Sequence, residues 1–427
     1  MNYQESMEFL EEIKKYGSIL GLMSIQNLMS ELGNVQEQLP VIHVAGTNGK
    51  GSVCAMLSSV YQQAGYQVGR FCTPDVFSYE EEFLYNNTPI SRERLAEIFT
   101  TVRNACRRLI GKGCPHPTRF EVETAAAWLW MWEEKIDLAI IETGLGGETD
   151  ATNLITKPFV SVFSSIGMDH MQFLGNTLEK IASVKAGIIK QGCPTVSSWQ
   201  QEEAADVIRC RARQKNSQCI FAEEKWIRGL KFKNGMASFS YKEHEDIKLP
   251  LAGGFQVQNA ACVLETLDLL KEYFPVNEAQ IVKGLKDCLW PGRLEKIGSR
   301  PDVYIDGAHN TDAAEKLKET LETCFTEKRI VYIMGVLKDK EYKAISDIMF
   351  GPHDKVFLIK PENQRGLAAF RLEKILLEMQ VEAVVKEHVK DALEAALQTV
   401  DSGDMILAFG SLSYLKEVKD AYGLTGQ

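Results

Sequence analysis

The sequence has no hydrophobic run long enough to cross a membrane, no C-x-x-C pair and no cluster of His and Cys residues at zinc-binding spacing. A membrane span needs about 20 consecutive apolar residues, and structural zinc sites need closely spaced ligands. The ten cysteines are scattered, which is typical of free thiols in a reducing cytosol and not of a disulfide framework. We therefore expect a cytoplasmic protein that has no membrane contact.

The sequence also lacks the excess of basic residues that nucleic-acid-binding proteins carry. It has 48 Lys and Arg against 58 Asp and Glu, a net charge of −10. A protein that binds a phosphate backbone presents a basic face, so nucleic acid is not an expected partner. An anionic small molecule such as ATP needs only local positive charge. The length of 427 residues, 45% of them hydrophobic, suits a globular protein of two or three domains.

The most informative feature that the chain does contain is a glycine-rich segment, residues 46–52, with the sequence Gly-Thr-Asn-Gly-Lys-Gly-Ser. The apolar residues 41–45 before it predict a strand, and residues 53–61 after it predict a helix. Backbone N–H groups of such a turn point at phosphate groups, and the helix dipole adds partial positive charge. We expect Lys50 to reach the β- and γ-phosphates of a nucleotide and Ser52 to face Mg²⁺. The spacing is shorter than the usual phosphate-loop pattern, and a plain strand-to-helix turn is the alternative interpretation.

Strands and helices alternate along most of the chain, which predicts an α/β fold. The continuous apolar runs 137–141 and 160–166 are typical of buried parallel strands. Residues 91–110, 118–132 and 178–189 have the pattern of helices, with Ser91 as the N-cap of the first.

Two segments interrupt this alternation. Residues 73–90 predict a polar, aromatic loop, and residues 215–250 alternate polar and apolar side chains and predict a small antiparallel sheet. A fresh alternation runs from residue 303 to residue 409. The predicted fold class is α/β, with a phosphate-loop-containing, doubly wound, mostly parallel sheet in residues 1–295 and a second, smaller Rossmann-like domain in residues 296–427.

Polar side chains follow the predicted strands at their carboxyl ends, where open parallel sheets bind ligands. Glu142 follows the apolar run 137–141 and, beside a phosphate loop, its carboxylate would hold Mg²⁺; a turn cap is the alternative. We expect Asp169 and His170 to end the next strand in the same way, with His170 as a second metal ligand or as a structural histidine. Lys185, on the helix that follows, is either a solvated helix lysine or a group close to this site.

The second predicted domain has a similar group of polar residues. Residues 306–310, with the sequence Asp-Gly-Ala-His-Asn, follow its first strand and suggest a ligand surface. A charged helix cap is the alternative interpretation. Arg293, which precedes this domain, is a candidate cation for nucleotide phosphates.

Taken in order, these blocks resemble the folylpolyglutamate synthase/dihydrofolate synthase family, a branch of the Mur-ligase-like ATP-dependent amide ligases. The resemblance covers nearly the whole chain, and six or more ordered blocks are more specific than any single motif. The most specific blocks are residues 46–52, 144–147, 150–153 and 185–190.

The resemblance implies an ATP site and a magnesium site. The residues that it implies for ATP are Gly49, Lys50, Gly51, Ser52, Asn259, Arg293 and Asp306. The residues that it implies for magnesium are Ser52, Thr73, Glu142, His170 and Lys185. Lys185 matches the lysine that is carbamylated in this family, a change that turns a cation into a carboxylate-like oxygen ligand. With Lys50 and Lys185, His309 is the third implied catalytic residue, near the γ-phosphate or the incoming amino acid.

The resemblance also implies a pterin pocket. Its residues would be Leu20, Gly21, Leu22, Thr118, Phe120, Glu121, Thr149, Asp150 and Ala151. Several positions depart from the family pattern: Glu82 and Glu148 each stand where an Arg is usual, and Phe255 and Asp75 each stand where a His is usual. The family's Thr-Ser-Pro is here Cys72-Thr73-Pro74, so the hydroxyl is kept. The exchange of Arg for Glu reverses the local charge, and an anionic acceptor would bind less well there.

The activity implied by the resemblance is ATP-dependent amide formation. The γ-phosphate would pass to a carboxylate of the acceptor, and the amine of L-glutamate would attack the resulting acyl phosphate. The acceptor is a reduced folate, dihydropteroate or both, and the residues do not choose between them.

Two other interpretations stay open at this stage. One is a Mur-ligase-like relative that joins an amino acid to a different carboxylate acceptor, motivated by Glu82 and Glu148. The other is a nucleotide-binding paralogue without ligase turnover, against which the intact Lys50, Glu142, His170 and Lys185 argue. Because the family mostly works as monomers, we expect a monomer.

Overall fold

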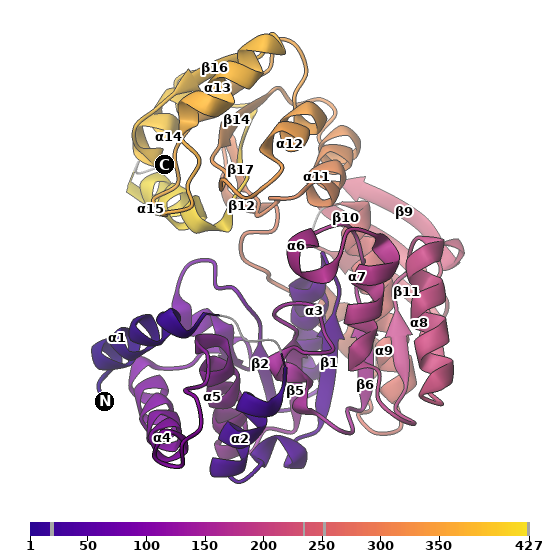
Figure 1. The fold of residues 1–427 in the computed structure, drawn as a ribbon. Helices are drawn as coiled ribbons and strands as arrows, with labels where there is room; N and C mark the ends of the chain where they lie inside the picture. Colours follow the sequence, from indigo (N-terminus) through magenta and orange to yellow (C-terminus); the bar gives the residue numbers. More distant parts are fainter. Residues whose placement is uncertain (18–20, 234, 251–252, 425–427) are drawn as a thin grey trace. The chain divides into compact units, whose positions relative to one another are not determined.

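The computed structural model describes residues 1–17, 21–233, 235–250 and 253–424 (Figure 1). The chain divides into two compact units. The first contains Met1–Gly229, Phe239–Lys248 and Gln258–Cys288, and the second contains Leu230–Ser238, Leu249–Val257 and Leu289–Gln427. The predicted domain boundary at residue 296 stays a prediction.

The first unit is built on an eight-stranded sheet. Its strands are β1 (Val41–Ala45), β2 (Val68–Phe71), β3 (Phe83–Tyr85), β4 (Thr88–Pro89), β5 (Leu138–Glu142), β6 (Val160–Phe163), β7 (Thr195–Ser197) and β8 (Cys219–Phe221). The spatial order is β4-β3-β2-β5-β1-β6-β7-β8. From β2 to β8 neighbouring strands pair in parallel, whereas β3 and β4 pair antiparallel at one edge. The mostly parallel sheet was predicted from the buried apolar runs.

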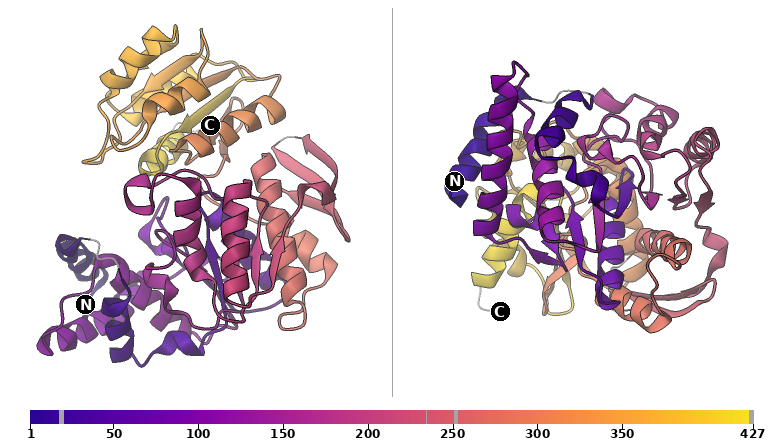
Figure 2. Two further views of the ribbon diagram at one scale, coloured as in Figure 1. Left: turned by 45° about the vertical axis from the view of Figure 1, so that its right-hand side comes forward. Right: turned by 90° about the horizontal axis from the view of Figure 1, so that it is seen from below.

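Helices cover both faces of this sheet. They are α1 (Tyr3–Ile13), α2 (Met23–Glu31), α3 (Lys50–Gln63), α4 (Arg92–Gly111), α5 (Arg119–Glu133), α6 (Met171–Leu174), α7 (Leu178–Lys185), α8 (Glu202–Gln214), α9 (Gly254–Leu270) and α10 (Glu278–Lys286). Val41 and Ala45 of β1 point to the face that carries α1, α2, α4, α5, α7 and α8. Ile42 and Val44 point the opposite way, toward the face on which α3 packs. α7 and α8 lie side by side in each view (Figure 1 and Figure 2).

Short 3-10 helices connect several of these elements. They are η1 (Lys14–Tyr16), η2 (Val35–Gln38), η3 (Tyr79–Glu82), η4 (Ala151–Leu154), η5 (Ala186–Ile188), η6 (Glu224–Trp226) and, near the carboxyl end of the chain, η7 (Leu412–Tyr414).

The predicted Ser91 cap is present, and a second cap, which was not predicted, begins α5. The Ser91 side chain accepts a hydrogen bond from the backbone N–H of Arg94 and begins α4. Thr118 caps α5 and forms a capping box with Glu121, so α5 begins one residue later than predicted. These caps satisfy N–H groups that have no partner within the helix.

Some predictions about the first unit were wrong. Residues 73–90 are not all loop, because they contain η3 and the β3–β4 hairpin. Residues 219–221 belong to β8 of the main sheet, and the strand expected at 160–166 ends at Phe163. β7, β8 and β3 have only three residues each, too few for a periodic pattern to stand out in the sequence.

A small sheet follows. Its strands are β9 (Ile227–Lys233), β10 (Met236–Tyr241) and β11 (His244–Leu249), in the order β11-β10-β9. β10 and β11 are joined by two residues, as in an antiparallel hairpin. The later part of the segment 215–250 therefore forms a small sheet, as predicted.

The second unit has a six-stranded sheet in the order β12-β13-β17-β14-β15-β16. Its strands are β12 (Glu295–Gly298), β13 (Asp302–Ile305), β14 (Ile330–Met334), β15 (Lys355–Leu358), β16 (Glu382–Val385) and β17 (Met405–Phe409), and its helices are α11 (Thr311–Cys324), α12 (Tyr342–Met349), α13 (Ala369–Glu378), α14 (Val389–Leu397) and α15 (Leu415–Leu424). Only β12 runs antiparallel to its neighbour. Tyr332 and Met334 of β14 pack with α11, α12 and α13, while α14 packs on β14 and β15 and contacts α15. This is the predicted second α/β domain; β12, β16 and α15 were not predicted.

Among the described residues, no helix is both long and apolar enough to cross a bilayer.

Candidate active site

The glycine-rich segment forms a tight loop between β1 and α3 that has no room for side chains at two of its glycines. Gly46 has φ +152° and Gly49 has φ +86°. A Cβ atom on Gly46 would lie 2.0 Å from the Ser164 Oγ, and one on Gly49 would lie 2.4 Å from the Asn259 Oδ1. The structure therefore brings the predicted Asn259, on α9, against the predicted phosphate loop.

Lys50 and Ser52 lie in the first turn of α3, which begins at Lys50 and not at residue 53 as predicted. The Lys50 Nζ is 3.6 Å from the Glu142 Oε1 and donates a hydrogen bond to the Thr47 carbonyl oxygen at 3.3 Å. Ser52 is buried. The N-terminal N–H groups of a 14-residue helix thus begin where a lysine, a hydroxyl and a carboxylate converge, which is the arrangement that binds phosphate and a divalent cation.

Lys185, the last residue of α7, joins this group. It is buried, and its Nζ donates a hydrogen bond to the Gly46 carbonyl oxygen at 2.6 Å. Burial, reinforced by the positive charge of Lys50, lowers the pKa of Lys185 to about 7, although the carboxylates of Asp169, Asp150 and Glu142 act in the opposite sense. The interpretation of Lys185 as a solvated helix lysine is therefore wrong, and a large fraction of its amine is uncharged near neutral pH.

Glu142 is the last residue of β5 and is buried. β2 and β5 pair in parallel with Phe71 opposite Ile141, so Cys72 comes next to Glu142 when that register is continued by one residue. Thr73, the predicted magnesium ligand, follows Cys72 and is half-buried. A third group, the Cys54 side chain from α3, also reaches this point: the Cys54 Sγ, the Cys72 Sγ and a Glu142 oxygen all lie within 4.8 Å of one another.

His170 does not end a strand, and that prediction was wrong. β6 ends at Phe163, and His170 is the N-cap of the short helix α6, with φ +50°. Its side chain is 47% exposed and its Nε2 is 3.9 Å from the Asp169 Oδ2. Asp169 acts electrostatically on Lys185, which places this loop on the Lys185 side of the site. The role of His170 as a metal ligand stays a prediction.

The predicted pterin residues group around the loop that follows β5. The Phe120 ring lies over Gly144, where an added Cβ would be 2.4 Å from the ring. Asp150 accepts hydrogen bonds from the backbone N–H groups of Leu145 and Thr152, so it holds the loop in shape. Thr149 is exposed and Ala151 is buried.

The remaining pterin residues lie at the start of α5 and beside α2. Glu121 accepts hydrogen bonds from the Thr118 backbone N–H and from the Ser24 hydroxyl. Gly21 and Ser24 line a cavity of about 180 Å³. Leu22 is the N-cap of α2, and Leu20 lies outside the described residues.

The predicted residues of the second unit also come together. Asp306 follows β13, and its carboxylate oxygens accept hydrogen bonds from the backbone N–H groups of Leu294 and Ala308. Burial raises the pKa of Asp306, and the Arg293 guanidinium acts in the opposite sense. An added Cβ on Gly307 would lie 3.1 Å from the Arg293 Nη1. His309 Nδ1 is 2.7 Å from the Gly307 carbonyl oxygen.

The residue of this group that caps a helix is uncharged, so the alternative of a charged helix cap is not confirmed. Asn310 is the N-cap of α11 and accepts a hydrogen bond from the Ala313 backbone N–H. Asp306 instead closes the turn between β13 and α11. Whether it also contacts ATP stays a prediction, since each carboxylate oxygen can accept more than one hydrogen bond.

Sequence reasoning missed a buried histidine in β1. His43 Nε2 is 2.9 Å from the Thr152 hydroxyl, which donates to Asp150. Burial lowers the pKa of His43 to about 3, with Lys190 adding to the effect. His43 therefore stays uncharged and ties the central strand to the loop that carries Asp150. The only sign of this burial in the sequence is that His43 lies within the apolar run 41–45.

Comparison with known proteins decides the family. A model of the Mur ligase middle domain matches residues 44–267, and a model of the Mur ligase glutamate ligase domain matches residues 292–412. The chain is 40% identical to the dihydrofolate synthase/folylpolyglutamate synthase of Bacillus subtilis, over 80% of this chain and 81% of that protein. The chain belongs to the folylpolyglutamate synthase/dihydrofolate synthase family of Mur-type ligases.

Solved structures of this family have the same fold. A folylpolyglutamate synthase complexed with AMPPCP and folate matches with a TM-score of 0.85 and 31% identity, over 99% of this chain and 100% of that one. The Mycobacterium tuberculosis folylpolyglutamate synthase complexed with ADP matches with a TM-score of 0.88 and 26% identity, over 100% of this chain and 99% of that one. The predicted fold class and family are confirmed.

The two charge reversals relative to the family pattern have different surroundings. Glu148 is exposed, and its carboxylate is 3.4 Å from the Arg211 guanidinium. Glu82 is buried, and burial raises its pKa well above the usual range, with Glu123 and Asp75 adding to the shift. Burial thus disfavours the charged form of Glu82, which the sequence alone does not indicate. The expectation that Glu82 weakens the binding of an anionic acceptor stays a prediction.

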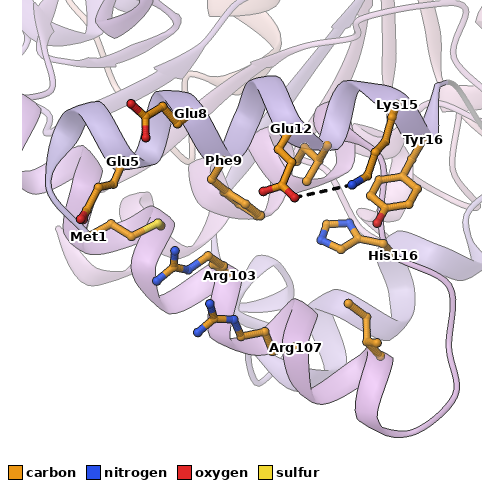
Figure 3. A pocket seen from close by; sticks show the side chains of 12 residues that line it. Met1, Glu5, Glu8, Phe9, Glu12, Lys15, Tyr16, Arg103, Arg107 and His116 are labelled. Carbon is orange, nitrogen blue, oxygen red and sulfur yellow. Dashed lines mark ion pairs between the residues drawn. The ribbon is translucent and has the colours of Figure 1, made fainter.

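A second cavity, of about 530 Å³, lies between α1 and α4 (Figure 3). Arg103 and Arg107 point into it from α4, and Glu5, Glu8 and Glu12 lie along α1 on its other side. Its far end holds the stacked rings of Tyr16 and His116, with centroids 4.7 Å apart. The cavity contains charges of both signs, and none of the predicted nucleotide, metal or pterin residues lines it.

Proposed function

We propose that this protein is an ATP-dependent amide ligase that joins L-glutamate to a folate, to dihydropteroate or to both. The observation that carries the proposal is the convergence of Lys50, Lys185 and Glu142 on one glycine loop, in a chain that belongs to the folylpolyglutamate synthase/dihydrofolate synthase family. A folate and an ATP analogue are the ligands named for the solved relative described above.

The residues of the first unit fit ATP with Mg²⁺. The loop packs so closely on Ser164 and Asn259 that a Cβ atom at Gly46 or Gly49 would clash with them. Its glycines let the chain turn there, and the backbone N–H groups of Gly49, Gly51 and their neighbours would bind phosphate oxygens. The hydroxyls of Ser52 and Thr73 and the carboxylate of Glu142 are the hard oxygen donors that Mg²⁺ prefers. Bound ATP supplies the phosphoryl group that makes the acceptor carboxylate, a poor electrophile, open to attack by an amine.

The two lysines of the site, Lys50 and Lys185, then have separate roles. Lys50, held between Glu142 and the Thr47 carbonyl oxygen, offsets the negative charge that gathers between the phosphates and the acceptor carboxylate. Lys185 would be carbamylated: its uncharged Nζ attacks CO₂, a C–N bond forms, and one proton passes to solvent. The resulting carbamate is an anion in place of a neutral amine, and it would supply further oxygen ligands for Mg²⁺.

Three further contacts are proposed from the family resemblance. Arg293 would bind a phosphate of ATP, and His309, with Nδ1 directed at the Gly307 carbonyl oxygen, would present Nε2 to the phosphate or to the amine of glutamate. Asp306 keeps its predicted ATP contact in this proposal.

The acceptor would enter on the side of Phe120 and Gly144, where Asp150 and Glu121 fix the surrounding backbone. The alternative of a different carboxylate acceptor rested on Glu82 and Glu148. Because Glu82 is buried and Glu148 is paired with Arg211, that alternative has lost its main support. The alternative of a paralogue without turnover is disfavoured by the intact lysines and carboxylate.

We also propose that the protein acts as a monomer in the cytoplasm. All ten cysteines are free of disulfides, which agrees with a reducing compartment.

The test is phosphate release from Mg·ATP with L-glutamate, compared among tetrahydrofolate, dihydropteroate and no acceptor, with the product mass measured. We expect release that depends on a pterin and a product heavier by one glutamyl residue. ATP binding without pterin-dependent release would contradict the proposal and favour a paralogue without this turnover.

A further inference from the structure

Two cysteines lie next to Glu142, the carboxylate proposed to bind magnesium. Cys54 lies on α3, one turn after Lys50, and Cys72 directly follows β2. Both thiols and Glu142 are buried, and the two sulfur atoms and a carboxylate oxygen lie within 4.8 Å of one another. In the part of the chain that the structure describes, no other three His, Cys, Asp or Glu side chains are grouped in this way.

The chemistry of this group differs from that of a magnesium site. Mg²⁺ takes oxygen ligands in an octahedron and does not favour sulfur. Two thiolates and a carboxylate instead match Zn²⁺, which binds Cys at about 2.3 Å in a tetrahedron. Tetrahedral geometry at that length sets the two sulfur atoms about 3.8 Å apart, a separation compatible with the observed grouping. Three protein ligands leave the fourth position to water.

One residue of the group departs from the usual family pattern. Position 72 is Cys here, whereas the family pattern has Thr at that place. A chain with Thr at this position would offer only one sulfur, together with Glu142. The sulfur pair is therefore not part of the usual family pattern for binding the nucleotide.

We propose that Cys54, Cys72 and Glu142 form an inhibitory Zn²⁺ site that competes with Mg·ATP for the Glu142 carboxylate. On binding, each thiol releases one proton to solvent, two Zn–S bonds and one Zn–O bond form, and Glu142 leaves its 3.6 Å ion pair with Lys50. No oxidant takes part. The regulatory role rests on the proposed ligase function, whereas the binding site itself does not.

The binding test uses the full-length, reduced and chelator-treated protein, with Cd²⁺ as a spectroscopic probe of the same ligands. We expect one equivalent of Cd²⁺ to produce the ultraviolet thiolate-to-cadmium absorption band and Zn²⁺ to displace it. Cys54→Ser and Cys72→Ser should each lose the band, and Cys210→Ser, which changes an exposed thiol, should keep it. Glu142→Gln retains both sulfur atoms and should keep the band while its Cd²⁺ affinity falls at least about tenfold.

Folding of each variant is checked by its melting temperature. Cd²⁺ should raise the melting temperature of the wild-type protein and of Cys210→Ser, but not that of Cys54→Ser or Cys72→Ser. An unchanged band in both buried-cysteine variants, or a Cys54–Cys72 disulfide in place of a metal complex in the reduced protein, would overturn the proposal.

The regulatory test measures phosphate release at fixed Mg·ATP while Zn²⁺ is raised, with the activity of each variant in Mg²⁺ alone as its own reference. We expect Cys72→Thr to need at least about tenfold more Zn²⁺ for half-inhibition than the wild-type protein, whereas Cys210→Ser should match the wild-type protein. Equal inhibition of all three would overturn the regulatory role. A Cd²⁺ site in a protein without pterin-dependent turnover would instead contradict the proposed ligase function alone.

Discussion

Glu142 and Asp306 occupy comparable places in the two sheets, yet their oxygens have different partners. Glu142 ends β5 in the first unit and lies 3.6 Å from the Lys50 ammonium. Asp306 follows β13 in the second unit and accepts hydrogen bonds from two backbone N–H groups, of Leu294 and Ala308. One carboxylate faces a cation and two thiols, whereas the other closes its own turn.

The difference follows from side-chain length and from the residues that come next. An Asp side chain is short enough to bond the backbone two residues on, as Asp306 does with Ala308 and as Asp150 does with Thr152. A Glu side chain at the end of a strand reaches past its own turn. A carboxylate after a buried strand is thus a candidate ligand when it is Glu, and is first a turn-former when it is Asp.

The largest effect is expected for the cation that faces Glu142. Lys50→Ala should lower phosphate release by about 10²–10³-fold, because one preorganised charge at the phosphates is lost. Lys180→Ala, at an exposed position on α7 with one long hydrogen bond to Asn176, is the matched control and should stay near the wild-type rate. Near-normal activity of Lys50→Ala would mean that the nucleotide site has been assigned wrongly.

The close packing of the loop gives the next effect. Gly49→Ala puts a Cβ 2.4 Å from the Asn259 amide at φ +86°, and we expect affinity for the ATP analogue AMPPCP to fall at least tenfold. Gly65→Ala has a similar φ of +93° but open space around it, so it should cost only about 1–2 kcal/mol of stability through backbone strain and leave AMPPCP affinity unchanged. Calorimetric titration of both variants is the measurement, and equal affinities would contradict the packing of Asn259 on the loop.

Carbamylation of Lys185 predicts a dependence on CO₂. Phosphate release in buffer stripped of CO₂ should fall and should recover on adding bicarbonate, and Lys185→Gln should be slower by about 10–100-fold and indifferent to bicarbonate. Labelled ¹³CO₂ should give a carbamate NMR signal in the wild-type protein that Lys185→Gln lacks. If the wild-type rate did not depend on bicarbonate and no such NMR signal appeared, carbamylation of Lys185 would be contradicted.

The longer helices and the strands of four or five buried residues were predictable from the sequence, and the fold class followed from them. The 3.6-residue pattern of α4 and the apolar runs of β1, β5 and β14 are visible in the sequence because one face or both are buried. The three-residue strands and the β3–β4 hairpin were not predictable, because a segment of two or three residues is too short to show a periodic pattern of apolar residues.

The site was predictable where the residue type fixes the chemistry and not where burial does. Lys50, Glu142 and Lys185 meet as the family pattern implied. The burial of Glu82, the cap role of His170 and the meeting of Cys54 with Cys72 depend on contacts between segments far apart in the sequence, which a single sequence does not display.

An effect on stability, with no effect on the chemistry, should separate two buried histidines. His43 has its pKa lowered to about 3 by burial, so below pH 6.5 the unfolded chain takes up a proton that the folded chain refuses. Stability should fall by up to about 1.4 kcal/mol per pH unit between pH 6.5 and 3, and His43→Gln should show a shallower loss in urea unfolding.

His244 gives the opposite sign and serves as the control. Despite its burial, hydrogen bonds and charge from Asp268 and Glu278 raise its pKa to about 9, so its contribution is present below pH 6.5 and is lost as the pH rises through 9. The slope of unfolding free energy between pH 6.5 and 3 should therefore be the same in His244→Gln as in the wild-type protein. If His43→Gln kept the wild-type slope, the uncharged state of His43 would be contradicted.

The comparison of the two carboxylates is tested most directly by measuring turnover and urea unfolding side by side in Glu142→Gln and Asp306→Asn. Asn at position 306 can accept only one of the two backbone hydrogen bonds, so the account predicts a loss of about 1–3 kcal/mol of stability with a smaller effect on turnover once the protein is folded. Glu142→Gln should lose turnover by at least about 10²-fold and remain the more stable of the two variants. The reverse pattern, a stable but inactive Asp306→Asn and an unstable but active Glu142→Gln, would contradict the assignment of chemistry to Glu142.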